Sequence, residues 1–506
     1  MNYPYKLLLT YLVPEIIVLA TGLMVLGLDL GLLRRRSLVS RTQVAVLLSA
    51  IGLLVALLGS LQVPGHFWTG PPSERETFFD GMLVLDRLTQ LGKQIILGLS
   101  VFAVLVSAHS RFTAHIGEYF LLLLLATIGM MFLVSSENLL VIFIALELLS
   151  LSLYIMTAFN KQSIQSAEAA LKYFLFGGMS AAFMLFGLSL LYGASGELNL
   201  PRIASTLKGA SLDPLVAIAV IMVVIGFGFK VAAVPFHLWA PDAYQGAPLP
   251  AAAFIASGSK VASFFILAKV LFVGFAGTEG SAGWRHFAQG WMPLIAVIAT
   301  LSMVIGNIAA IAQKSVRRLL AYSAIAHGGY VLVGILANNQ QGMASVLYYV
   351  VTYALTVTGA FCVLLAFEQS ADRDRFSSLS GFARREPLLA FCMMIFILSL
   401  AGIPPLAGFF GKFYLFAAAL NSTSGSTGLL WLVIVAIAMS TVSLYYYLQV
   451  LKQIYVRPAG DGIVPVRSTL SLRTLAALIA ASLLALGFAP NLLLNKAHLA
   501  AAVIGR

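Results

Sequence analysis

Residues Gly226 to Pro250 read GFGFKVAAVPFHLWAPDAYQGAPLP, an apolar stretch that begins like a helix and is then interrupted by prolines. Proline removes a backbone donor and disrupts the preceding helical turn. A second stretch of this kind, SLAGIPPLAGFFGKFYLF from Ser399 to Phe416, lies in the other half of the chain. At membrane depth, broken helices persist only inside protein or beside a polar cavity. Both stretches therefore predict a helical membrane protein with a functional site at each break.

The whole chain has the composition of a membrane protein. Of its 506 residues 60% are hydrophobic and 10% charged, with a mean hydropathy of +0.95, whereas a soluble protein keeps about 25% of its residues charged. Apolar runs of the roughly 20 residues that a membrane helix needs recur from end to end. We expect an all-α polytopic fold of about fourteen transmembrane helices, centred near residues 20, 52, 97, 126, 148, 180, 225, 260, 300, 328, 355, 402, 440 and 481.

The two breaks also predict an internal repeat. Lys230 precedes Pro235 in the first break, whereas Lys412 follows Pro405 in the second, and this opposite order is typical of inverted repeats. We expect one membrane domain over residues 1–506. It would comprise helices 1–3 in 1–115, a first five-helix repeat in 116–274, a second in 289–455, and helix 14 in 470–490, with helices 7 and 12 broken.

The net charge of +12 follows the membrane topology and does not indicate nucleic acid. Basic residues gather in alternate connections, which the positive-inside rule assigns to the inner side. This pattern predicts a multi-pass protein of the bacterial inner membrane with both termini on the periplasmic side. The inner connections hold most of the arginines and lysines outside the helices, including Arg34, Arg35, Arg36, Lys314, Arg317, Arg318, Arg384 and Arg385.

Several chemistries have no support in the sequence. The two cysteines, Cys362 and Cys392, lie in apolar runs, and no Cys/His cluster indicates a metal or iron–sulfur site. No GxGxxG or Walker motif follows a strand pattern, so nucleotide binding has no support either. We expect no cofactor and no metal in this chain.

Four ionisable residues lie in the middle of apolar segments. They are Glu147, in LLVIFIALELLSLSLYIM, and Lys230, Lys260 and Lys412. An ionised side chain at mid-membrane costs at least about 2.5–3.5 kcal/mol, and such residues are functional by default. The alternative is that they form structural ion pairs.

One acid and three lysines in a bundle suit proton transfer. An apolar environment disfavours the ammonium form of lysine, whereas a nearby carboxylate favours it, so changes around such a lysine load and unload a proton. Two unit charges about 7 Å apart interact by a few kcal/mol at an effective dielectric of about 20. Coupling of this size decides protonation without covalent chemistry.

Other intramembrane charges are open to two interpretations. His327, in AYSAIAHGGYVLV, fits a packed core histidine as well as a proton relay. Lys172 lies five residues into its segment and fits either role. For Lys269, Arg87 and Lys93, which lie near segment ends, we favour side chains that extend to the membrane interface.

These residues lie in motifs that resemble a known family. ALELLSLSLYIMTAF around Glu147, SAEAALKYFLFGGMSAAFMLFG around Lys172 and the stretch around Lys230 are the most specific. SGSKVASF, QKSVRRLLAYSAIAHGGY and LAGIPPLAGFFGKFYLF also match. From about Leu83 to Asn491 the chain resembles the antiporter-like membrane-arm subunits of proton-pumping NADH–quinone oxidoreductase, respiratory complex I, in the subunit N form.

The resemblance implies a role for each site residue. Glu147 would pair with Lys230 and modulate it, Lys260 would be the central proton carrier, and Lys412 the terminal carrier. Lys172 and His327 would be secondary polar links. NADH, FMN, iron–sulfur clusters and quinone would belong to partner subunits, and the partners would be other membrane-arm subunits and the lipid bilayer.

Three other functions compete with this interpretation. A subunit of a multi-subunit sodium/proton antiporter or of a membrane-bound hydrogenase would share the motifs. A solute transporter would need a midplane pocket with paired polar groups, whereas the sequence has single charges spread over several helices. A structural scaffold would hold the same charges in fixed ion pairs.

Overall fold

The computed structural model of the chain describes residues 9, 11–61, 75–207, 213–367, 374–422, 428–458, 466 and 468–503. These ranges are almost entirely helical. The helices are α2 (Val13–Leu30), α3 (Leu38–Leu61), α4 (Arg87–Ser107), α5 (Ile116–Ser135), α6 (Leu139–Thr157), α7 (Ile164–Ser195), α8 (Leu200–Leu207), α9 (Pro214–Val231), α10 (Trp239–Gly246), α11 (Leu249–Ala256), α12 (Gly258–Lys269), η1 (Val270–Gly274), α13 (Trp291–Ile311), α14 (Val316–Leu336), α15 (Gln340–Leu364), η2 (Leu365–Phe367), η3 (Phe376–Leu379), α16 (Phe382–Arg385), α17 (Pro387–Ala401), α18 (Ala407–Leu420), α19 (Leu430–Tyr455), α20 (Leu470–Phe488) and α21 (Asn491–Ala501).

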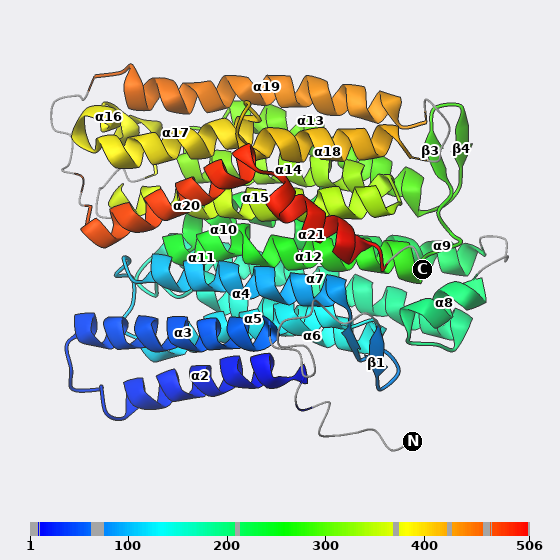
Figure 1. Ribbon diagram of the computed structural model, residues 1–506, viewed down its shortest axis with the longest axis horizontal. Coiled ribbons are helices and arrows are strands. Elements are labelled where there is room, and N and C mark those ends of the chain that lie inside the picture. The colour runs from blue at the N-terminus through cyan, green and yellow to red at the C-terminus, as the bar shows by residue number, and fades with distance from the viewer. Residues whose placement is uncertain are drawn as a thin grey trace.

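The long helices lie side by side as a single bundle (Figure 1). Within the described ranges, 13 helical segments are long and apolar enough to cross a membrane. They account for every predicted centre except the one near residue 402. At that point the chain has two shorter helices, α17 and α18, of 15 and 14 residues. The polytopic helical prediction is therefore confirmed, and the predicted twelfth helix is divided.

Both proline-containing stretches interrupt their helices as expected. The first helix, α9, ends at Val231, and the next residue, Ala232, has a left-handed backbone with φ +57°. The second, α17, ends at Ala401, and Gly402 has φ +82°. In each case the residue after the helix donates its N–H back to carbonyls of the last turn. The carbonyls that follow have no intrahelical donor and need other partners.

Polar residues fix where the site helices begin. The Asn138 side chain accepts from the N–H groups of Leu140 and Val141 at the start of α6. The Ser315 hydroxyl accepts from the Arg318 N–H at the start of α14. These caps satisfy backbone donors that every helix start leaves unpaired. They thereby set the depth of Glu147 and His327 in the bundle.

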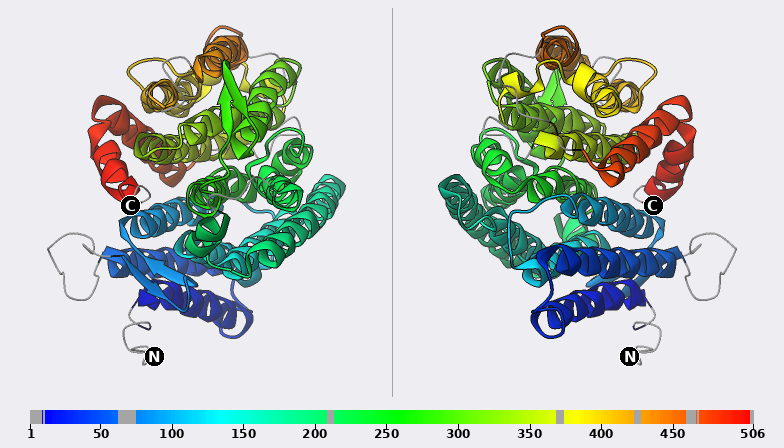
Figure 2. Two further views of the ribbon diagram at one scale, coloured as in Figure 1. Left: turned by 90° about the vertical axis from the view of Figure 1, so that its right-hand side faces the viewer. Right: turned by 90° about the vertical axis from the view of Figure 1, so that its left-hand side faces the viewer.

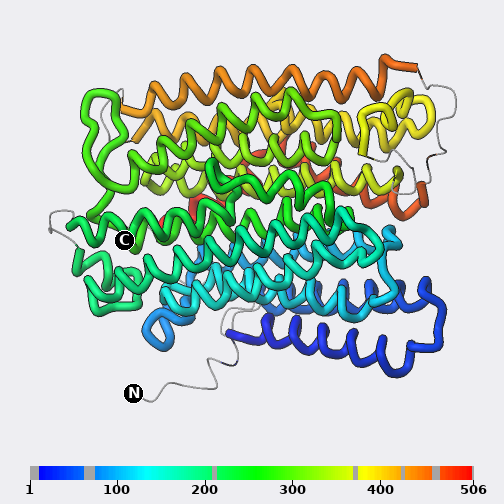
Figure 3. Tube along the Cα trace, turned by 180° about the vertical axis from the view of Figure 1, so that it is seen from behind, coloured from blue at the N-terminus to red at the C-terminus, as the bar shows by residue number. Residues whose placement is uncertain are grey.

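Two helical segments form the centre of the bundle. The segments Leu249–Gly274 and Gln340–Phe367 are each long enough to cross a membrane, and the apolar stretch of each is completely buried inside the protein. Seen end-on, α7 lies at one side of the bundle and α20 and α21 lie at the other (Figure 2). The view from behind shows α2 and α3 along one edge and α19 along the opposite edge (Figure 3). The central segments therefore contact other helices on all sides.

Two short hairpins interrupt the helical pattern. Strands β1 (Glu76–Phe78) and β2 (Leu83–Leu85) are antiparallel, with Thr77 opposite Val84. Strands β3 (Ser281–Gly283) and β4 (His286–Ala288) are also antiparallel, with Ala282 opposite Phe287. The all-α prediction omitted both hairpins. Each strand has three residues, which is too short for an alternating pattern to be recognised.

The hairpins mark one end of the bundle. Helix α2 starts, and α21 ends, toward the end that carries β3 and β4 (Figure 1). The terminal residues themselves, 1–8, 10 and 504–506, lie outside the described ranges. Their predicted periplasmic side therefore stays a prediction.

Candidate functional site

The first part of the candidate site is one face of α6. Glu147, Ser150 and Tyr154 follow one another at spacings of three and four residues, which places them on the same side of a helix. Glu147 is half-buried, whereas Ser150 and Tyr154 are buried. The apolar helix therefore carries a polar stripe toward the broken helix α9.

Lys230 lies opposite this stripe, one residue before the end of α9. Its amino group donates hydrogen bonds to the Ser150 hydroxyl and, at 3.4 Å, to the Tyr154 hydroxyl. Among the described residues no carboxylate lies within ion-pair distance of this amine, although the charge of Glu147 acts on it electrostatically. The implied pairing of Glu147 with Lys230 is thus not a direct contact in this structure. The acid lies one turn before the serine that the lysine reaches.

Aromatic rings enclose the Lys230 amine. It lies 5.5 Å from the centre of the Tyr154 ring and 5.2 Å from that of Phe229. Tyr173 stacks on Trp239 with ring centres 4.2 Å apart, and the Trp239 indole donates to the Phe229 carbonyl at 3.0 Å. This packing ties α10 to the end of α9. The rings of Tyr154 and Phe229 present their faces to the Lys230 amine, and such faces attract a cation.

Lys260 lies on the other side of the same break. Its amino group donates to the backbone carbonyl of Val231 at 3.1 Å and to that of Ala324, in α14, at 3.4 Å. The side chain is 2% exposed. The Val231 carbonyl is free to accept because α9 ends there. Through this one residue, Lys230 and Lys260 are brought to the same helix end.

His327 lies one turn beyond Ala324 in α14. Its Nδ1 is 2.5 Å from the Tyr349 hydroxyl, and its Nε2 is 2.9 Å from the Tyr447 hydroxyl. The Tyr447 hydroxyl also bonds Ser323. The imidazole is buried and experiences the charges of both flanking lysines, Lys260 and Lys412. Both ring nitrogens therefore belong to a hydroxyl network located between two amines.

Lys412 occupies the second break. Its amino group donates to the carbonyls of Leu400 and Ala401, at 3.0 and 3.1 Å, and to the Ser440 hydroxyl at 2.9 Å. It also lies 5.3 Å from the centre of the Tyr330 ring. The side chain is buried. The amine thus caps the end of α17 and contacts α19, the edge helix of the bundle.

Within the described residues, none of the three central lysines has an acidic partner in ion-pair contact. In the ranges that the structure describes, no ion pair involves the amine of Lys230, Lys260 or Lys412, whose donors go to hydroxyls and backbone carbonyls. The alternative of fixed structural ion pairs does not describe these residues. Burial of an uncompensated charge is costly, so such amines are suited to exchange a proton.

Lys172 has a different environment from the central lysines. Its amine pairs with Glu168 at 2.6 Å and with Asp242 at 3.0 Å, and the side chain is 41% exposed. Asp242 also pairs with Arg318 at 2.5 Å. The structure places Lys172 in a half-exposed ion network that joins α7, α10 and α14. This network does not include Lys230, Lys260 or Lys412.

Two lysines near segment ends form buried ion pairs. Lys93 pairs with Glu15 at 2.7 Å, and Lys269 pairs with Glu137 at 3.4 Å, all with side chains at most 4% exposed. Glu137 also bonds Arg75. The prediction that Lys93 and Lys269 extend to the membrane interface is wrong, because Glu15 in α2 and Glu137 in the connection between α5 and α6 hold them inside. Arg87 is half-buried at the start of α4, and its assignment stays a prediction.

Several contacting residues were missed at the sequence level. Ser150 and Tyr154 carry a signal that could have found them, since they follow Glu147 on one helix face. Tyr349 and Tyr447 lie 22 and 120 residues from His327 in the sequence. Only the tertiary packing brings them to the histidine.

A metal site has no ligands in the region that the structure covers. Among the described residues there is no group of three or more His, Cys, Asp or Glu side chains that could hold a metal ion.

The chain is similar to known proteins in both sequence and fold. Residues 136–441 match the family described as NADH:quinone oxidoreductase/Mrp antiporter, TM. The chain is 53% identical over 501 residues to NADH-quinone oxidoreductase subunit N 2 of Acidobacterium capsulatum, with 97% of this chain and 98% of the relative covered. A chain in the structure of respiratory complex I from Thermus thermophilus with bound aureothin has 34% identity and a TM-score of 0.77, with 95% and 98% covered.

A more distant structural likeness extends beyond these proteins. A chain of the Mrp complex from a Dietzia species has a TM-score of 0.78, with 98% of this chain and 97% of that chain covered. Its sequence identity is 22%. At this identity the likeness shows a shared fold alone.

Proposed function

Since the chain belongs to the NADH-quinone oxidoreductase subunit N family, the membrane subunits of respiratory complex I, we propose that it moves protons through the row Glu147, Lys230, Lys260, His327 and Lys412. The chain is a membrane-arm subunit that takes part in proton translocation. NADH oxidation and quinone reduction take place on other subunits of the enzyme, which are also its partners.

One observation supports this path above the others. The side chains of Lys260 and Lys412 are buried and that of Lys230 is half-buried, and within the described ranges none of the three amines has an acidic partner. Lys93, Lys269 and Lys172 are instead paired with acids. A paired buried lysine is held in its charged form by its partner. An unpaired one, bonded to carbonyls and hydroxyls, can lose a proton without leaving a buried carboxylate uncompensated. The unpaired lysines are therefore the carriers in this proposal.

The order of the carriers follows from their contacts. Glu147 lies one turn before Ser150, whose hydroxyl accepts from Lys230, and Lys260 bonds the carbonyl of Val231, the residue after Lys230. His327 lies between Lys260 and Lys412, with tyrosine hydroxyls at both ring nitrogens. Moving a negative charge toward or away from Glu147 would change the protonation of Lys230 first. The change would then pass from one carrier to the next by charge repulsion.

The two breaks also fit the proposed inverted repeats, 116–274 and 289–455. Each proposed repeat contains one helix that ends at a left-handed residue, Ala232 or Gly402, and resumes a few residues later. We propose that the chain crosses the bacterial inner membrane fourteen times in this arrangement, with α17 and α18 together forming one crossing. The basic connections would face the cytoplasm.

The direct test is Lys230→Ala in the assembled complex. Electron transfer from NADH to quinone and proton uptake into vesicles are measured in the same preparation. We expect both rates to fall together by roughly tenfold or more, because about 1.4 kcal/mol on one barrier already gives a tenfold effect. Lys230→Met, which keeps the apolar stem, should behave in the same way.

The matched control is Lys314→Ala, which removes an exposed lysine outside the row. This variant should keep both rates. If Lys230→Ala and Lys230→Met assemble normally and retain wild-type rates, the proposed path through α9 is wrong.

A further inference from the structure

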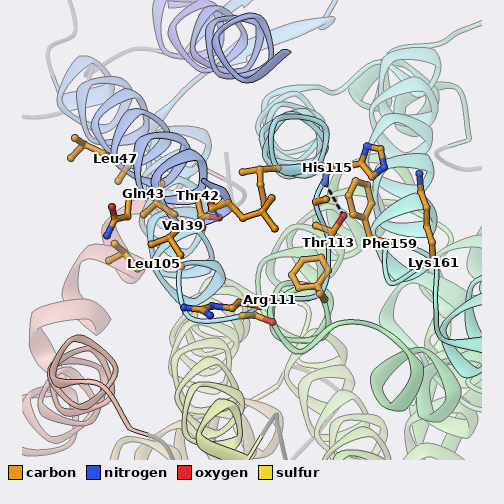
Figure 4. Close-up of a pocket in the computed structure, with 18 of the residues that line it drawn as sticks. Val39, Thr42, Gln43, Leu47, Leu105, Arg111, Thr113, His115, Phe159 and Lys161 are labelled. Carbon is orange, nitrogen blue, oxygen red and sulfur yellow. Dashed lines mark hydrogen bonds between the residues drawn. The ribbon is translucent and has the colours of Figure 1, made fainter. Parts of the chain in front are cut away.

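A groove opens at the end of the bundle opposite the two hairpins. It has a volume of about 760 Å³ and lies between α3, the connection from α4 to α5, and the end of α6. Figure 4 shows Val39, Leu47 and Leu105 on one side, and Phe159 and Lys161 on the other. Concave sites of about 300–1,000 Å³ are typical of small organic ligands, whereas protein interfaces are larger and flatter.

The walls of the groove are apolar. Val39, Val46 and Leu47 come from α3 and Leu105 from α4, while the connection from α4 to α5 and the end of α6 complete the lining. Both helices are long and apolar enough to cross a membrane. Val39 and Leu47 are 48% and 60% exposed in the chain. This wall is therefore open to hydrocarbon and is not filled by the protein itself.

The rim of the groove is basic. Arg111, in the connection between α4 and α5, and Lys161, just beyond α6, both line the groove and are exposed. In the part of the chain that the structure describes, neither side chain forms an ion pair or a hydrogen bond. Two cations without partners thus lie where the apolar wall ends.

Nearby acids are already occupied. The Asp29 carboxylate pairs with Arg41 at 2.7 Å and accepts the Gly117 N–H at 2.8 Å. Glu118 pairs with His115 at 3.1 Å. Among the described residues that line the groove, none is acidic. Its uncompensated charge therefore comes from Arg111 and Lys161.

We propose that this groove binds one anionic membrane phospholipid. The headgroup phosphate is held at the rim by Arg111 and Lys161, and an acyl chain lies along Val39, Val46 and Leu47. A basic rim above an apolar wall at the end of membrane helices matches such an amphipathic anion, and basic pockets between membrane helices hold anionic headgroups in this way. Phosphatidylcholine also carries a phosphate, but its choline ammonium offsets that charge at the rim, so a lipid with a net negative charge matches the two cations better. This inference is independent of the proton path.

The test uses the assembled complex in vesicles that contain a phospholipid with a photoactivatable acyl chain. The probe is phosphatidylglycerol in one preparation and phosphatidylcholine in the other. After illumination, labelled positions in 38–50 and 105–116 are quantified by mass spectrometry. We expect at least about fivefold more label from phosphatidylglycerol, because one cation near an anionic surface contributes about 1 kcal/mol.

Variants identify the residues responsible. Arg111→Gln/Lys161→Gln should reduce phosphatidylglycerol labelling of the groove to the phosphatidylcholine level. The double variant should assemble, because both side chains are exposed and unpaired. If the double variant does not assemble, Arg111→Gln and Lys161→Gln are compared separately in the same way. Lys314→Gln/Arg457→Gln removes two exposed cations that do not line the groove and should leave labelling unchanged.

Three results would overturn the proposal. The first is equal labelling by the two lipids. The second is undiminished labelling of Arg111→Gln/Lys161→Gln. The third is an unlabelled groove on a chain labelled elsewhere, which would mean that a neighbouring protein covers it.

Discussion

The amino group of Lys260 lies 3.1 Å from the carbonyl oxygen of Val231, the last residue of α9. Lys412 makes the same contact in the other half of the chain, 3.1 Å from the carbonyl oxygen of Ala401, the last residue of α17. The end of a helix carries a partial negative charge from its unpaired carbonyls. Both lysines thus have a helix end as their partner in place of a carboxylate. A partial charge stabilises the ammonium form less than an acid would, which suits a group that must also give up its proton.

Replacement of Lys412 by arginine tests whether this position needs only a positive charge or must also release a proton. A guanidinium fills the same role as a donor but stays protonated in proteins. We expect Lys412→Arg to assemble and to lose proton uptake and coupled quinone reduction by roughly tenfold or more. Lys452→Arg, at an exposed lysine in the last turn of α19, is the control and should pump normally. Wild-type pumping by Lys412→Arg would remove Lys412 from the path.

The Ser150 hydroxyl should be needed for communication between Glu147 and Lys230. A hydrogen bond to a charged group is worth about 1.5–3 kcal/mol, so Ser150→Ala should slow proton uptake roughly tenfold. Within the described ranges, the nearby Ser152 donates only to the Leu148 carbonyl of its own helix, at 2.8 Å. Ser152→Ala is therefore the matched control. Equal rates in the two variants, measured as initial proton uptake, would show that Ser150 is dispensable.

The hydroxyls around His327 give a third prediction. Tyr447→Phe keeps the ring but removes the hydroxyl that lies 2.9 Å from Nε2. We expect slower proton uptake with normal assembly, because the imidazole loses one of its two hydroxyl partners. Tyr445→Phe, at a tyrosine that is 56% exposed, should have no effect. If His327→Gln and Tyr447→Phe both pump at wild-type rates, His327 is a packed core residue.

The buried pair of Lys269 and Glu137 should stabilise the fold without carrying protons. Removal of one partner of a buried ion pair costs about 3–5 kcal/mol when a charge is left uncompensated, and the cost is smaller here because Glu137 keeps its bond to Arg75. Lys269→Met should therefore lower the thermal unfolding midpoint of the complex. The double variant Lys269→Met/Glu137→Gln should recover part of the loss. A Lys269→Met complex of normal stability that fails to pump would place this pair on the proton path.

The sequence singled out the proposed carriers because each is a single charge in an apolar run. Glu147, Lys230, Lys260 and Lys412 needed no partner to be recognised, and the prolines near two of them indicated the helix breaks. The sequence did not show which lysines form ion pairs with acids. Lys93 and Lys269 resemble interface lysines in sequence, and their acids, Glu15 and Glu137, lie on distant segments that only packing brings near.

The hydroxyls of the site were hidden for a related reason. Serine in a membrane helix commonly bonds its own backbone, as Ser150 does to the Leu146 carbonyl. Ser150 shares a helix face with Glu147, but the local sequence does not show that its hydroxyl also contacts a lysine. Tyr349 and Tyr447 were hidden because tyrosine is common in packed helices. Their proximity to His327 depends on how α14, α15 and α19 pack together.

The helices that carry the proposed row lie side by side, so the row runs from helix to helix and not along any one of them (Figure 1). Transmembrane voltage acts along the membrane normal and is worth about 2.3 kcal/mol per elementary charge at 100 mV. A proton that passes sideways at nearly constant depth crosses little of this field. The electrical work is then concentrated in uptake from one aqueous side and release to the other. Charge-displacement recordings on the complex would register those two steps, while the lateral transfers between carriers remain electrically silent.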